Sequence, residues 1–198
     1  MKISHLIFGL GGVALVALAA LVFWPEKALV PKPKGYPRIE VPAGEGVALQ
    51  APVPFGLVHH PNASWETKPE AGWGDLVYPF CQGRVQFTYA PVRGNLPQLI
   101  DDAHELAMKH SVAADGMSQM VYVNDSLKVY GILFRIGGNA ASGLQFYATD
   151  SSRHFVRGAL YVYAHPNADS LAPVHAFFEG EFTRYLETLE WRGASGRP

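Results

Sequence analysis

The sequence predicts an α+β fold, an α/β/α sandwich in which two helices cover an antiparallel sheet. Strand-like runs alternate with short turns between Gly131 and Trp191. Two segments repeat apolar residues at helical spacing, and several strands are apolar on both faces. Short connections between successive strands imply antiparallel neighbours. Because both faces of such a sheet need cover, the two helices are expected to supply it.

The N-terminal segment, residues 6–24, contains no charged residue. A helix of nineteen residues is roughly 28 Å long, close to the ~30 Å hydrocarbon core of a bilayer. Trp24 follows as an interfacial aromatic, and Pro25-Glu26-Lys27 forms a polar stop. We expect residues 1–24 to act as an uncleaved signal anchor. The small residues Ala17-Leu18-Ala19 leave a cleaved signal peptide as the alternative.

Residues 25–61 are expected to form a proline-rich tether. They contain eight of the fifteen prolines, a spacing that prevents helix and favours extended chain. Two interpretations stay open: a spacer that holds the domain off the membrane, or a segment that packs along the domain through Tyr36, Ile39 and Val41.

Residues 62–192 are predicted to form one α+β domain, followed by a tail at 193–198. Alternation of Val85, Phe87 and Tyr89 predicts a half-buried strand that ends at Pro91. Asn95 is expected to cap the first helix. The apolar stripe of that helix is Leu96, Leu99, Ile100, Ala103, Leu106, Ala107 and His110, and Glu105 and Lys109 form an i,i+4 pair.

Four strands and a long helix complete the domain. The strands are expected at Gln119–Val123, Lys128–Ile136, Gly143–Thr149 and His154–Ala164, separated by Gly, Asn, Ser and Asp turns. The helix begins at Asp169 or Ser170, and its stripe is Leu171, Val174, Phe178, Phe182, Tyr185, Leu186 and Leu189. The order β-α-β-β-β-β-α looks like the PsbP-type fold.

Composition and motifs argue against several functional classes. A net charge of -1 gives no general attraction to nucleic acid. Cys81 is the only cysteine, so no intramolecular disulfide forms, and it is expected to be structural. The adjacent His59 and His60 are interpreted as exposed loop residues, since metal-binding spacing is absent around them. We therefore predict no catalytic residues, no metal site and no cofactor.

Two surfaces are candidates for binding. Alternation along the last strand places Arg153, Phe155, Arg157 and Tyr161 on one face, a candidate partner-contact patch, because Arg and aromatic residues are frequent at interface hot spots. The competing interpretation has the arginines pair with Asp150 or Glu179 over a half-buried face. The second candidate is a small-ligand pocket at the sheet edge, near Asn139, Asp150 and Arg153.

Several blocks of the sequence resemble the gliding motility lipoprotein GldD family. The blocks are PKP-x-GY near the start, His110–Asp115, Val129–Leu133, Gly138–Phe146, Thr149–Tyr161, PN-x-DSLAPV and the closing Glu187–Trp191. One departure is that no cysteine lies near the end of the apolar segment, which puts lipidation in doubt.

The resemblance implies a cell-envelope component of the gliding machinery that is linked to type IX secretion and has no catalytic residues. We expect a non-enzymatic assembly or stabilising subunit whose partners are envelope proteins and whose periplasmic domain is anchored by residues 6–24. Positive charges after the segment favour a cytoplasmic domain on their own, but the family is exported. The alternative function is a periplasmic small-ligand-binding module.

Overall fold

The computed structural model describes residues 41–111, 116–137, 142–163 and 168–193. The predicted anchor and the first part of the predicted tether, up to residue 40, lie outside the described residues. Within the described part of the chain, no helix is long and apolar enough to cross a membrane.

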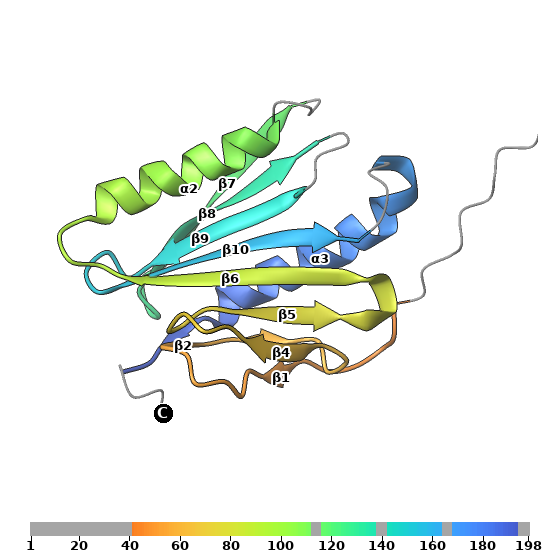
Figure 1. Ribbon diagram of the computed structural model, residues 1–198, viewed down its shortest axis with the longest axis horizontal. Coiled ribbons are helices and arrows are strands. Elements are labelled where there is room, and N and C mark those ends of the chain that lie inside the picture. Colours follow the sequence, from red (N-terminus) through yellow and green to blue (C-terminus); the bar gives the residue numbers. More distant parts are fainter. Residues whose placement is uncertain (1–40, 112–115, 138–141, 164–167, 194–198) are drawn as a thin grey trace, which may run out of the picture. The chain divides into compact units, whose positions relative to one another are not determined.

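The centre of the fold is a seven-stranded antiparallel sheet (Figure 1). Every neighbouring pair in this sheet is antiparallel, as the short connections predicted. In spatial order the strands are β4 (Ser64–Thr67), β5 (Gly74–Tyr78), β6 (Gly83–Pro91), β10 (His154–Val162), β9 (Leu144–Thr149), β8 (Val129–Ile136) and β7 (Met117–Asn124).

Two helices complete the α+β architecture. Helix α2 (Leu96–Ser111) packs against β8, β9 and β10, and helix α3 (Ala168–Thr188) packs against β9 and passes behind the sheet in Figure 1. The predicted order β-α-β-β-β-β-α corresponds to β6, α2, β7–β10 and α3 and is confirmed. The likeness to the PsbP-type fold stays a prediction.

The larger hydrophobic core lies between α3 and the sheet. All but the first residue of the predicted α3 stripe are buried, and Leu171 is partly exposed. Phe182 packs edge-on against Phe146 of β9, with ring centroids 5.4 Å apart. A smaller core under α2 contains Ala103 and Ala107. The buried members of the larger core on α3 are Val174, Phe178, Phe182, Tyr185, Leu186 and Leu189.

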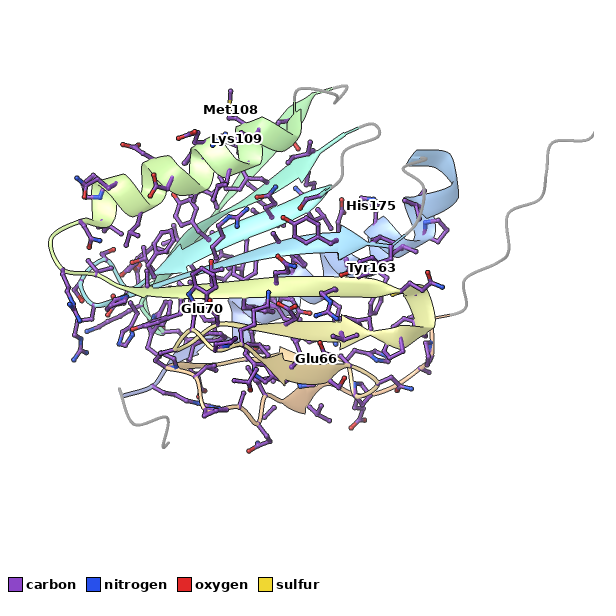
Figure 2. All side chains as sticks on the ribbon, in the orientation of Figure 1. Glu66, Glu70, Met108, Lys109, Tyr163 and His175 are labelled. Atoms are coloured by element: carbon purple, nitrogen blue, oxygen red, sulfur yellow. The ribbon has the colours of Figure 1, made fainter. Side chains whose placement is uncertain are left out.

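Among the described side chains of the predicted α2 stripe, which leave out His110, one is not covered. Leu106 is 38% exposed, whereas Ala103 and Ala107 on the same helix are buried. Helix α2 packs on the sheet through the buried Ala103 and Ala107 together with the partly buried Leu96, Leu99 and Ile100. The outer side of α2 carries Met108 and Lys109 (Figure 2).

The domain begins earlier than the predicted boundary at residue 62. Residues 47–59 contain the short strands β1 (Val47–Ala48), β2 (Phe55–Gly56) and β3 (Val58–His59). Leu49, Val53, Phe55 and Leu57 are buried in the larger core. This part of the predicted tether is therefore a packed segment, because its apolar residues between prolines cover the core. The segment also joins the C-terminus, where β2 pairs with β11 (Glu190–Trp191).

Glu181 of α3 is a buried carboxylate that joins three parts of the fold. Its side chain is 1% exposed and accepts hydrogen bonds from the His60 backbone N–H and the Tyr78 hydroxyl, both at 2.9 Å. Arg184 Nη1 lies 2.5 Å from Glu181 Oε1. Burial first, and then the neighbouring Tyr185 and Glu181, raises the pKa of Tyr78 far above its usual value, so this hydroxyl remains a donor. Buried charges require such partners.

His59 and His60 are buried, which corrects the prediction of exposed loop residues. Their exposed fractions are 6% and 3%. The His59 ring contacts the His60 carbonyl through Nδ1, and the His60 ring contacts the Pro42 carbonyl through Nε2. Both histidines lie where the N-terminal segment packs against α3. Their ring nitrogens form hydrogen bonds with backbone carbonyl groups.

We predict that Phe182→Ala destabilises the domain by about 3–5 kcal/mol, the usual cost of removing a fully buried aromatic side chain. Thermal or urea unfolding of the chain in detergent measures this change. Glu187→Ala, at an exposed position of the same helix, is the control and is expected to change stability by less than about 0.5 kcal/mol. Equal stability of the two variants contradicts the assigned packing of α3.

Candidate functional site

The candidate site is the part of the sheet, on the α2 side, that α2 leaves uncovered. Helix α2 packs on β8, β9 and β10, and the strands β6 and β5 beyond β10 have no helix in front of them in Figure 1. On this side β10 presents Phe155, Arg157 and Tyr161, and β6 presents Gln86 and Thr88. We call this surface the open face.

The four residues of the predicted contact patch share one side of β10 but differ in exposure. Phe155 is 5% exposed and stacks on Tyr147, with ring centroids 5.4 Å apart and an interplanar angle of 17°. Arg157 and Tyr161 are half-buried. The Arg153 side chain is 81% exposed. Phe155 is therefore a core residue, and the surface is built around the two arginines and Tyr161.

A groove of about 330 Å³ lies where α2 meets the open face. Arg157 lies on the sheet side of this groove, whereas Leu99, Asp102 and Leu106 contribute from α2. Its walls are mainly apolar, and one charge of each sign lies along them. The remaining lining residues are Trp73, Thr88, Tyr89, Ala90, Ala103 and Phe155.

Arg157 forms no ion pair with any carboxylate of the described residues. Its Nη2 donates a hydrogen bond to Oε1 of the buried Gln145. Burial lowers the pKa of the Arg157 guanidinium, while the neighbouring Tyr161 partly opposes this. The group nevertheless stays charged at neutral pH, because the pKa of an arginine side chain ordinarily lies far above neutral. A half-buried cation without a counter-charge leaves a favourable position for an anionic group.

The other charges of the open face compensate one another. Arg84 Nη1 lies 2.5 Å from Asp75 Oδ2 and 2.9 Å from Glu66 Oε2, and Lys68 Nζ lies 2.8 Å from Asp75 Oδ1. Asp75 is 1% exposed, so the two cations hold a buried carboxylate. Two cations and two anions cancel within this cluster, whereas Arg157 has no ion pair among the described residues, and Asp102 of α2 is the acidic residue that lines the same groove.

Asp150 organises the turn between β9 and β10. Its Oδ1 accepts backbone N–H bonds from Ser152 (3.0 Å), Arg153 (2.7 Å) and His154 (2.8 Å). Burial by itself raises the pKa of this carboxyl, but the N–H donors outweigh burial and lower the pKa to about 2. Arg153 Nε lies 4.0 Å from Asp150 Oδ2, so this pairing is loose. Glu179, the other predicted partner, pairs with Arg135 instead.

Two of the three residues of the predicted ligand pocket, Asp150 and Arg153, lie at the turn that follows β9, and Asn139 is outside the described residues. A cavity of about 630 Å³ lies beside Gly137 at the end of β8, and neither Asp150 nor Arg153 lines it. Its lining residues are Gly116, Met117, Ser118, Arg135, Ile136, Gly137, Gly143, Leu144, Ala172, His175, Ala176 and Glu179.

His175 and Cys81 are two further titratable residues whose pKa values are shifted by burial. His175 of α3 (Figure 2) lines the larger cavity, and burial lowers its pKa. Cys81 lies in the 3₁₀ turn η1 (Pro79–Cys81), is 5% exposed, and has a pKa raised by burial to about 11. The described residues contain no group of three or more His, Cys, Asp or Glu placed to hold a metal ion.

Trp73 and Thr88 belong to the groove but were not identified from the sequence. Trp73 follows a turn at Gly72, and its indole Nε1 donates to the Tyr89 carbonyl at 3.1 Å. The alternation of the β6 strand does place Thr88 opposite to Phe87. The sequence lacks any signal that β5 lies beside β6, and that pairing brings Trp73 to the groove.

Comparison with known proteins identifies one family. The model of the family described as gliding motility lipoprotein GldD matches residues 26–191 of the chain. No curated protein matches the chain.

We predict that the ionised carboxylate of Asp150 stabilises the fold in a pH-dependent way. The folded pKa is about 2, below the usual 3.8. This stabilisation is therefore present above the unfolded pKa and is lost as pH falls through the folded one. Asp150→Asn keeps an acceptor oxygen but no charge, and its stability deficit, measured by urea unfolding, should shrink between about pH 5 and pH 2. A deficit that stays constant over this range contradicts the assignment.

Proposed function

The chain belongs to the gliding motility lipoprotein GldD family, and we propose that it is a non-enzymatic assembly or stabilising subunit of the gliding machinery. Membership implies a component of gliding motility, and membership in a lipoprotein family suggests a membrane-anchored location in the cell envelope. Within this frame we propose a periplasmic domain that acts through protein contacts and is linked to type IX secretion.

The observation that carries this proposal is the open face. Arg157 lies in a mainly apolar groove without a carboxylate partner among the described residues. Arginine beside aromatic side chains is the composition typical of interface hot spots. A protein segment that places an acidic side chain at Arg157 and an apolar one against Leu106 and Trp73 fits both features, since it would neutralise the charge and cover the exposed apolar surface.

A small-ligand-binding module is the second candidate. The cavity of about 630 Å³ supports it, because binding pockets usually measure about 300–1,000 Å³ and carry a few polar groups on apolar walls. The polar side chains of this cavity among the described residues are Ser118, His175 and the Arg135–Glu179 ion pair, with a distance of 3.3 Å. A ligand that contacts them should raise the melting temperature, and His175→Ala should abolish that rise.

We predict that deletion of the gene abolishes gliding or the secretion of surface adhesins, and that wild-type chain restores it. Arg157→Ala should melt near the wild-type temperature but restore gliding poorly and recover fewer envelope proteins on co-purification. Removal of a charged hot-spot arginine commonly costs about 2 kcal/mol or more of binding free energy.

Glu187→Ala is the control, because it removes an exposed charge of α3 on the other side of the sheet that lines neither the groove nor the cavity. This variant should restore gliding fully. Normal gliding of the deletion strain contradicts the proposed function as a whole. Full restoration by Arg157→Ala contradicts only the role of the open face.

A further inference from the structure

Strand β7 forms one end of the seven-stranded sheet, and its outer edge is a second surface with an unusual composition. It pairs with β8 along all eight residues, Met117–Asn124, and has no partner strand on its other side within the described chain. Its sequence, MSQMVYVN, contains no charged residue, no proline and no glycine. Among the described residues, the backbone N–H and C=O groups of this outer edge have no strand partner.

The opposite edge of the same sheet is protected in the usual way. Strand β4 has only four residues, one of which is Glu66. Glu66 pairs with Arg84, and Lys68 follows the strand and pairs with Asp75. Natural sheets protect their edges with short strands, charges or prolines, because an unprotected edge pairs with other chains. None of these devices occurs on β7.

The side chains of β7 also present apolar surface. Val121 and Val123 are 69% and 61% exposed. In the register with β8 they lie opposite Ile132 and Tyr130, on the side of the sheet that carries α2. Helix α2 packs against β8, β9 and β10, so the sheet extends past the helix at this end.

We propose that β7 pairs with β7 of a second copy of this chain, antiparallel about a two-fold axis, so that two sheets join into one. In a two-fold arrangement β7 of one copy faces an identical β7 of the other copy. Like charges would then lie close together if the strand carried charged residues. Every cross-strand pair in this arrangement is uncharged. Pairing centred on Val121 joins residues 118–124 of the two copies and places Val121 of one copy opposite Val121 of the other, and β-branched pairs stabilise neighbouring strands.

The chain's own tether is a poor alternative partner on sequence grounds. Between residues 25 and 42, prolines at positions 25, 31, 33, 37 and 42 leave no run longer than five residues without proline, and the rest of the tether contains the segment packed on the core. Proline cannot donate a hydrogen bond to a strand ladder, so this segment cannot pair along an eight-residue edge. A second β7 pairs over seven of its eight residues, 118–124, in the register centred on Val121. The inference concerns a surface separate from the open face and does not depend on the role of Arg157.

Disulfide crosslinking of the full-length chain in membranes tests the pairing. Cys81 is buried and its thiol pKa is raised to about 11, so an introduced cysteine is the reactive one. We expect Val121→Cys, which lies opposite its own copy in this register, to give a crosslinked species with the mass of two copies. Glu187→Cys, exposed on α3, should remain monomeric. Absence of the species for Val121→Cys, or crosslinks only to a different protein, overturns the proposal.

A charge-reversal experiment checks that pairing, and not collision in the membrane, produces the dimer. Val121→Lys/Val123→Lys and Val121→Glu/Val123→Glu place like charges together in any antiparallel register near Val121. The mass of each variant in detergent should be that of one copy, and mixing the two should restore the mass of two copies. Normal melting of both variants shows that they fold. A two-copy mass for either variant alone also overturns the proposal.

Discussion

The buried carboxylate of Glu181 is the constraint on which the arrangement of the fold depends. It is held by Tyr78 of the sheet, by Arg184 of its own helix and by the backbone of His60 in the N-terminal segment. Removing one partner from a buried charge typically costs about 3–5 kcal/mol. The register of α3 against the sheet and the path of residues 49–60 are therefore coupled through one side chain. This coupling explains why a proline-rich segment belongs to the domain.

The division of the sheet into a closed side and an open side follows from this arrangement. Helix α3 and the N-terminal segment together cover the side that carries Phe87 and Phe146. The other side has only α2, which rests on Ala103 and Ala107 and lies close to β8, β9 and β10. Charged residues of β5 and β6 on this side form ion pairs with each other, as Asp75 and Arg84 do. Arg157 forms no ion pair among the described residues and instead donates a hydrogen bond to Gln145.

Much of the fold could be predicted from periodicity, and the missed parts have physical reasons. Long apolar repeats located α2, α3 and the strands from β6 to β10. Strands β4 and β5 have only four and five residues, so the alternation of apolar and polar residues in them is too short to identify a strand. The burial of His59 and His60 depends on α3, more than a hundred residues away. Alternation placed Arg157 on the correct side of β10, but the groove beside it requires the pairing of β5 with β6.

Site-specific photocrosslinking in gliding cells tests the central claim, that the open face makes the contacts and the α3 side is scaffold. A photoreactive residue at Thr88, on the open face within the groove, is compared with one at Glu187 on α3. The account predicts crosslinks from Thr88 to another envelope protein and none from Glu187. Crosslinks from Glu187 with none from Thr88 would contradict it.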